Sequence, residues 1–146
     1  MMAYTYDYPR PAVTTDVILV TRSSSPRILL IKRGKAPYKD HWALPGGFVD
    51  MDEDLPVAAL RELEEETGIT EVSIRQFKTY GAVGRDPRHR TISVVYTALV
   101  DGELKAKGMD DAIAAQWFAL DELPPLAFDH KQIVQEAIAF LQDGCL

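Results

Sequence analysis

The sequence is poor in three features that each mark a class of proteins: cysteine, long apolar runs and positive charge. Its one cysteine, Cys145, allows no disulfide within the chain, and a thiol this close to the C-terminus is not expected to be catalytic. No apolar run approaches membrane-spanning length and no signal peptide is recognisable, which favours a cytoplasmic protein without a membrane partner. The formal net charge of −6 argues against nucleic-acid binding, which needs a basic patch.

The chain is long enough, and has enough apolar side chains, to form one compact domain. Its 146 residues are 47% hydrophobic and 26% charged, sufficient to bury a sizeable core. We see no internal repeat, linker or low-complexity segment. We therefore expect a single domain over residues 1–146.

Several stretches have the β-branched composition of strands, and the last apolar stretch has helical spacing. A Ser-Ser-Ser-Pro turn separates the first two strands, which predicts a hairpin. Apolar residues three and four apart predict an amphipathic helix near the C-terminus. The expected strands are Ala12–Thr21, Arg27–Arg33, Thr91–Val100 and Ala115–Leu120, and the expected helix follows Asp129. Strands on both sides of a central helix predict a mixed sheet flanked by helices.

The N-terminal stretch alternates aromatic and polar residues from Tyr4 to Tyr8 before two prolines. We interpret it as an edge strand or as an arm that covers its own domain. The alternative is an aromatic surface for a partner subunit or a base. Aromatic residues pack more often than they recognise a ligand, so the first interpretation is favoured.

A central acidic helix is predicted between Asp54 and Gly68. Asp54 is a typical N-cap, Pro56 suits the first turn, and Gly68 suits the positive φ that ends many helices. At 100° per residue one arc should be buried, made of Pro56, Ala59, Leu60, Leu63 and Thr67. The neighbouring arc carries Glu62, Glu65 and Glu66, whose carboxylates repel one another. A divalent cation would compensate this repulsion, and the alternative is a solvated acidic face.

The surrounding residues favour the cation. Together with Trp42-Ala-Leu-Pro-Gly-Gly47, the helix has the pattern G-x5-E-x7-R-E-U-x-E-E-x-G-U, where U is a bulky aliphatic residue. This pattern resembles the Nudix box, and every specified position is met: Gly47, Glu53, Arg61, Glu62, Leu63, Glu65, Glu66, Gly68 and Ile69. The resemblance implies an α/β/α sandwich that hydrolyses a nucleoside diphosphate linked to another moiety, with Mg²⁺ or Mn²⁺ as the cofactor.

The resemblance also implies roles for individual residues. Glu62 and Glu66 are the strongest candidate ligands, and Glu65 is a candidate ligand or the base for the nucleophilic water. Arg61 is expected to hold a box carboxylate in its rotamer. The carbonyl of Gly46 is a further candidate ligand. Auxiliary candidates are Gly47, Glu53, Asp110 and Asp111; the last two lie in a glycine-containing loop and are either a general base or solvated turn residues.

The segment Gly84-Arg-Asp-Pro-Arg-His-Arg90 looks like that of the subgroup described as ADP-ribose pyrophosphatases. It predicts phosphate or ribose contact by at least one of Arg85, Arg88 and Arg90, since guanidinium groups recognise phosphate well. The expected reaction gives AMP and ribose 5-phosphate from ADP-ribose, with other nucleoside diphosphate sugars, dinucleotides and nucleoside triphosphates left open.

Three further expectations depend on the resemblance. A sensing domain of a Nudix-related transcriptional regulator is the alternative to an enzyme, and the complete set of box carboxylates favours catalysis. Lys32, Arg33 and Lys35 are expected mainly at the solvated surface, with phosphate contact as the second interpretation. His130 is expected to be a packing or helix-start residue. By analogy with the subgroup, the Tyr4–Tyr8 arm could exchange between the subunits of a homodimer.

Overall fold

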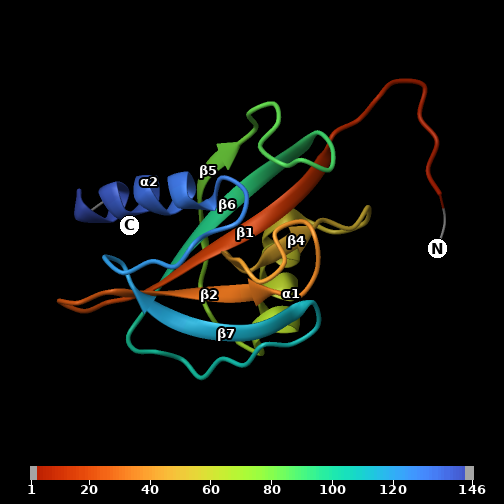
Figure 1. The fold of residues 1–146 in the computed structure, drawn as a ribbon. Coiled ribbons are helices and arrows are strands. Elements are labelled where there is room, and N and C mark those ends of the chain that lie inside the picture. Colours follow the sequence, from red (N-terminus) through yellow and green to blue (C-terminus); the bar gives the residue numbers. More distant parts are fainter. Residues whose placement is uncertain (1–2, 144–146) are drawn as a thin grey trace.

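The computed structural model describes residues 3–143, so Cys145 lies outside the described residues. Within them the chain builds one seven-stranded mixed sheet in the order β3-β2-β1-β6-β5, with β4 paired to β1 and β7 paired to β2 (Figure 1). The strands are β1 (Ala12–Thr21), β2 (Arg27–Arg33), β3 (Trp42–Ala43), β4 (Gly46–Phe48), β5 (Arg75–Tyr80), β6 (Thr91–Val100) and β7 (Ala112–Ala119). The helices are α1 (Leu55–Thr67) and α2 (His130–Gln142).

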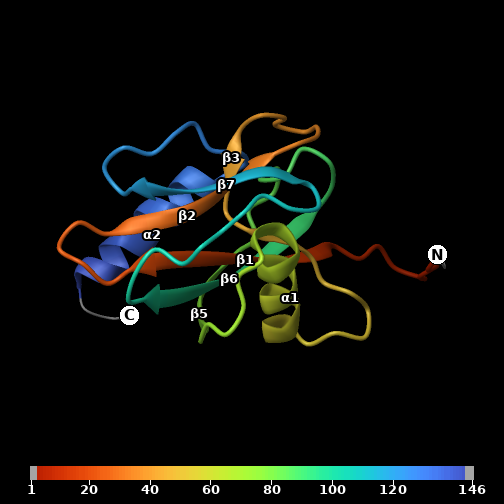
Figure 2. The ribbon, with the colours of Figure 1, turned by 90° about the horizontal axis from the view of Figure 1, so that it is seen from below.

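The two helices cover opposite faces of the sheet, as Figures 1 and 2 show. Alternate residues of β1 divide between the two cores, as expected for a strand buried on both sides. Val17 and Leu19 pack with Leu63 of α1, whereas Ile18 and Val20 pack with Ile133 of α2. The predicted α/β/α sandwich is confirmed.

The central strands match their predicted bounds. β1 and β6 run parallel over their whole length, from Ala12 beside Thr91 to Thr21 beside Val100. β1 and β2 are antiparallel, which confirms the predicted hairpin. β7 begins at Ala112, earlier than the predicted Ala115, because it follows β2 along the sheet through a register shift at Arg33. In the described chain, no helix is both long enough and apolar enough to cross a membrane.

Helix α1 begins and ends as predicted, but its buried arc is rotated. Gly68 has a φ of 78° and its N–H donates to the Glu64 carbonyl at 2.8 Å, which ends the helix. Leu60 is 36% exposed, so its predicted burial is wrong, and Pro56 is exposed as well. Ala58 and Glu66 are buried in their place, because the helix turns this side toward the sheet.

One prediction at the start of an element is confirmed and another is corrected. Asp54 is the N-cap of α1, as predicted; its side chain makes no capping hydrogen bond. Its backbone carbonyl accepts the first hydrogen bond of the helix, from Ala58 N at 3.0 Å. The Tyr4–Tyr8 stretch is neither a strand nor a covering arm: Tyr4 is 57% and Tyr8 80% exposed, and the stretch extends away from the domain (Figure 1). Exchange of this arm within a homodimer stays a prediction.

Candidate active site

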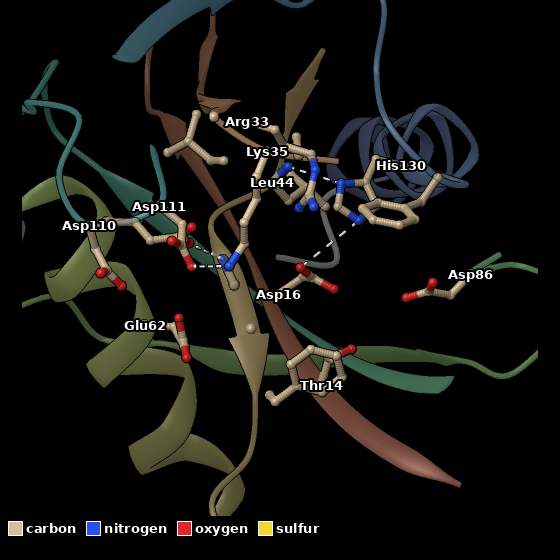
Figure 3. Close-up of a pocket in the computed structure, with 18 of the residues that line it drawn as sticks. Thr14, Asp16, Arg33, Lys35, Leu44, Glu62, Asp86, Asp110, Asp111 and His130 are labelled. Carbon is tan, nitrogen blue, oxygen red and sulfur yellow. Dashed lines mark hydrogen bonds and ion pairs between the residues drawn. The ribbon is translucent and has the colours of Figure 1, made fainter. Parts of the chain in front are cut away.

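A cavity of about 300 Å³ opens where α1, β4 and the start of α2 meet the end of β1 that carries Thr14 and Asp16. Figure 3 shows its labelled side chains. Glu62, Asp110 and Asp111 lie on one side, Arg33, Lys35 and His130 on another, and Asp16 between them. The fold therefore joins residues that are more than 100 positions apart in the sequence.

A close contact between α1 and β4 forms the first part of the site. Gly46 N–H donates to Glu66 Oε1 at 2.7 Å, which fixes that carboxyl group beside the Pro-Gly-Gly turn. A side chain at residue 46 would overlap the Thr15 carbonyl oxygen and the Asp16 carboxylate, so this approach requires glycine. At Gly47 an added Cβ would lie 2.6 Å from both carboxylate oxygens of Glu62. The two glycines thus allow the backbone to reach the box carboxylates.

Burial raises the pKa of the two box carboxyl groups that line the cavity, Glu66 and Glu62. Glu66 is 7% exposed. Its burial, with the nearby Glu62 and Asp16 carboxylates, raises its pKa to about 8 despite the hydrogen bond from Gly46. Burial also raises the pKa of Glu62, against the opposing effect of Arg61. A positive charge placed beside Glu62 and Glu66 would offset the cost of their ionised forms.

Arg61 joins the box carboxylates into one network. Its guanidinium donates to Glu53 Oε2 at 2.6 Å, to Glu62 Oε1 at 2.9 Å and to Glu65 Oε2 at 3.2 Å. The hydrogen bonds from Arg61 to Glu53 hold the pKa of that carboxyl at about 2. The Arg61 guanidinium also donates to the Phe48 carbonyl at 3.0 Å, which connects the network to β4. These contacts agree with an orienting role for Arg61.

The remaining acidic candidates differ in their relation to the cavity. Asp110 and Asp111 line it from the loop before β7 and are exposed. Asp111 forms an ion pair with Lys35, with Nζ and Oδ2 3.0 Å apart. Glu65 does not line the cavity; its side chain is 44% exposed and contacts Arg61.

Of the three predicted substrate-binding arginines, two line the cavity. Arg85 has a 5% exposed side chain and holds both oxygens of Asp129 at 2.8 and 2.7 Å. Arg88 donates to both oxygens of Asp86 at 3.0 and 2.7 Å. Arg90 lies outside the cavity lining, and its guanidinium donates to the Gly81 carbonyl at 2.7 Å.

The fold also brings in residues that the sequence did not single out or left as packing residues. His130 is buried, as predicted, and its Nδ1 accepts from Leu44 N at 3.0 Å, which leaves the proton of the neutral ring on Nε2. This Nε2 lies 4.0 Å from Asp16 Oδ1, and Asp16 Oδ2 accepts a short hydrogen bond from Ser93. A carboxylate inside the apolar strand β1 was the one available signal for Asp16. Phe48 and Phe128 line the cavity without a sequence signal.

The donor chemistry of the cavity fits a hard divalent cation. Among residues 3–143, no three His, Cys, Asp or Glu side chains are grouped as a metal site. Glu62 and Glu66 nevertheless line one side of the cavity together with Gly46, and all of these offer oxygen ligands, the type that Mg²⁺ and Mn²⁺ prefer.

A family model described as the NUDIX domain matches residues 10–137. The chain belongs to the Nudix family. This Nudix chain is 43% identical to an ADP-ribose pyrophosphatase of Methanocaldococcus jannaschii over 88% of its own length and 74% of that protein. It is 37% identical to the ADPR responsive transcriptional repressor NtrR of Acinetobacter baylyi, over 94% of its length but only 57% of the repressor.

A solved structure of the same Nudix fold contains ADP ribose. It is the NUDIX domain of Shewanella oneidensis NrtR, which superposes with a TM-score of 0.85 at 33% identity. The match covers 93% of this chain and 94% of that domain. The family and the fold predicted from the box are therefore confirmed.

Proposed function

We propose that this Nudix chain hydrolyses the diphosphate bond of a nucleoside diphosphate derivative, with ADP-ribose and water giving AMP and ribose 5-phosphate. The observation that carries the proposal is the buried Glu66 carboxyl beside Glu62 in a cavity lined by oxygen donors. The 43% identity with a protein named ADP-ribose pyrophosphatase supports the choice of substrate. Other nucleoside diphosphate derivatives are the competing substrates, because the loops rather than the box select the ligand.

Mg²⁺ or Mn²⁺ is the cofactor that suits this donor set. Glu62 and Glu66 would hold it, with the Gly46 carbonyl as a further ligand and Glu65 as a ligand or the base. When bound, such a cation screens the charge of a diphosphate and lowers the pKa of an attacking water. Arg61 would keep Glu62 and Glu65 in position, since it already bonds both.

Other residues of the chain would bind the substrate and handle the proton. Arg85 and Arg88 line the cavity, and the guanidinium N–H groups that their bonds to Asp129 and Asp86 leave free would contact phosphate or ribose. Asp110 and Asp111 are the loop candidates for a general base. We leave Arg90 out of the substrate contacts because it lies outside the cavity lining.

The test is product formation from ADP-ribose in Mg²⁺ or Mn²⁺, measured by chromatography of AMP and ribose 5-phosphate. We expect turnover that excess EDTA abolishes and that re-added cation restores. A panel of nucleoside diphosphate sugars, dinucleotides and nucleoside triphosphates should be turned over less efficiently. If a nucleoside triphosphate is hydrolysed more efficiently than ADP-ribose, the proposed substrate is wrong and the proposed reaction type still holds.

The similarity to an ADPR responsive repressor and to an ADP-ribose-bound NUDIX domain favours one second candidate, a domain that senses ADP-ribose without cleaving it. Calorimetric binding of ADP-ribose, with no AMP formed in either cation, would support the sensor over the enzyme.

A further inference from the structure

A buried carboxylate interrupts the apolar face that β1 turns toward α2. Asp16 precedes Ile18 and Val20 on that face, and these two residues pack in the core beneath α2. Asp16 is only 6% exposed, and it lines the cavity. A charged side chain is rarely buried to this extent without a partner of opposite charge, so Asp16 calls for an explanation.

The Asp16 carboxylate has few partners within the protein. Its Oδ2 accepts a short hydrogen bond from Ser93 on the neighbouring strand β6. Within residues 3–143, no lysine or arginine lies within ion-pair distance of Asp16, and its Oδ1 accepts no hydrogen bond. The second carboxylate oxygen is therefore free to accept a hydrogen bond from a ligand in the cavity.

A hydrogen-bond donor lies opposite this oxygen. His130 Nδ1 accepts from Leu44 N, and burial lowers the pKa of His130 against the opposing charges of Asp16 and Asp129. The ring is therefore neutral, with its proton on Nε2. This Nε2 is 4.0 Å from Asp16 Oδ1, which is beyond hydrogen-bond distance (Figure 3). The protein thus holds a donor and an acceptor close together without joining them.

The gap between these two atoms fits one oxygen atom of a particular kind. An oxygen about 2.8 Å from both Nε2 and Oδ1 would be in hydrogen-bond contact with each. A hydroxyl group suits this position, because it can accept from Nε2–H and donate to Oδ1 at the same time. A phosphate oxygen would be repelled by the carboxylate, and a metal cation would be repelled by the N–H donor.

We propose that Asp16 and His130 form a subsite for a sugar hydroxyl, which donates to Asp16 Oδ1 and accepts from His130 Nε2–H. That the sugar belongs to a nucleoside diphosphate derivative rests on the proposed function. Gly46 pairs with Asp16 in the sheet and donates to Glu66, so the subsite adjoins the carboxylates of α1. The sugar is therefore one that is joined directly to the diphosphate. In ADP-ribose this is the ribose of the adenosine or the terminal ribose.

The subsite makes Asp16 a residue that determines specificity. Its carboxylate favours a neutral hydroxyl over an anionic group at the same position. If the terminal ribose is the bound sugar, a nucleoside triphosphate would place a phosphate group near Asp16 instead, and the two negative charges would repel each other.

The experiment measures the binding of ADP-ribose and its deoxy analogues by isothermal titration calorimetry in excess EDTA, which prevents cation-dependent turnover. Each analogue lacks one hydroxyl, either of the adenosine ribose or of the terminal ribose. The variants are Asp16→Ala, which removes the carboxylate, and Asp16→Asn, which keeps an acceptor but removes the charge. The matched control is Thr97→Val, because Thr97 is a polar residue of β6 that is equally buried, at 4% exposed, but does not line the cavity.

In the wild type and in Thr97→Val, we expect one analogue to bind at least about 10-fold more weakly than ADP-ribose, since a hydrogen bond to a charged group is strong. That analogue identifies which ribose occupies the subsite. Asp16→Ala should bind ADP-ribose and this analogue with affinities within about 2-fold of each other, and Asp16→Asn should show an intermediate ratio. The proposal is overturned if no analogue binds more weakly than ADP-ribose, or if Asp16→Ala distinguishes the two ligands as strongly as the wild type.

Two measurements keep the outcomes separate. Thermal unfolding shows whether each variant is folded; if Asp16→Ala is not, the ratio in Asp16→Asn, which keeps an acceptor for Ser93, decides the question. An equal loss of affinity for ADP-ribose and every analogue would mean that Asp16 acts on the shape of the cavity, and it would refute the subsite.

Turnover in Mg²⁺ is followed in parallel with the same ligands. Discrimination that depends on Asp16, without formation of AMP, would refute the enzyme and keep the subsite. Turnover whose kcat/KM ratios are the same in wild type and Asp16→Ala would refute the subsite and keep the enzyme. If the wild type binds no ligand in EDTA, these kcat/KM ratios decide; neither binding nor turnover would overturn both proposals.

Discussion

Among the side chains of α1, Glu66 is the one whose surroundings are hardest to explain without a ligand. Glu64, two positions earlier, is exposed to water, whereas Glu66 is buried against Gly46 and faces the cavity. The two residues have the same side chain and lie on the same helix. Variants of the two can therefore distinguish the role of a box carboxylate from the effect of removing one negative charge from the helix.

We predict that Glu66→Gln lowers kcat for ADP-ribose in Mg²⁺ by at least about 100-fold while the protein stays folded. Glutamine keeps the size and the acceptor for Gly46 N–H but removes the charge that would hold a cation. Glu65→Gln should also lower kcat by orders of magnitude if Glu65 serves as ligand or base. Glu64→Gln, the control, should retain wild-type kcat. Steady-state kinetics and circular dichroism check this; near-normal turnover in Glu66→Gln would remove Glu66 from the mechanism.

At the scale of elements, the sequence predicted the long strands more accurately than the short ones. β1, β2 and β6 have the predicted bounds because strands buried in a sheet covered on both faces consist mainly of apolar and β-branched residues. The two- and three-residue strands β3 and β4 were not predicted, since so short a stretch has no periodicity of its own. They form because β1 and β2 offer free pairing positions beside the Pro-Gly-Gly turn.

The connection between α2 and that turn supports a second prediction. His130, the first residue of α2, accepts from Leu44 N, and Gly46 two residues later donates to Glu66. His130→Leu leaves a buried N–H unpaired, which should cost about 1–3 kcal/mol of unfolding free energy. It should also lower kcat at least about 10-fold, because the turn is no longer fixed beside Glu66. His130→Asn, which restores an acceptor, should recover part of kcat.

Tyr80→Phe is the matched control for this prediction. Tyr80 also ties α2 to the sheet, through a 2.7 Å hydrogen bond from its hydroxyl to Glu136, but it does not line the cavity. Urea unfolding should show a loss of stability in both variants, whereas ADP-ribose turnover should fall only in His130→Leu. Equal turnover in the two variants would reduce His130 to a packing residue.

At the scale of the whole molecule, the sequence predicted the box carboxylates and two of the cavity arginines, Arg85 and Arg88, but missed other residues that line the site. The box carboxylates are contiguous along one helix, so helical geometry alone predicts that they lie together. Asp16, Phe128 and Arg33 come from different parts of the chain, and only the sheet order brings them around one cavity. No local pattern contains that information, which is why Arg33 was expected mainly at the surface.

The proposed cation site connects α1 with β4 and β1, so its occupancy should be visible in the stability of the whole domain. A cation at ten times its dissociation constant stabilises the folded state by about 1.4 kcal/mol. For a domain of this size we expect the unfolding midpoint to rise by roughly 3–6 °C. Scanning calorimetry in MgCl₂ or MnCl₂, against EDTA at matched ionic strength, measures this without any substrate. Glu64→Gln should show the full rise and Glu66→Gln little or none. A rise of equal size in both would mean that the cations bind elsewhere, and the carboxylates of α1 would then need another explanation.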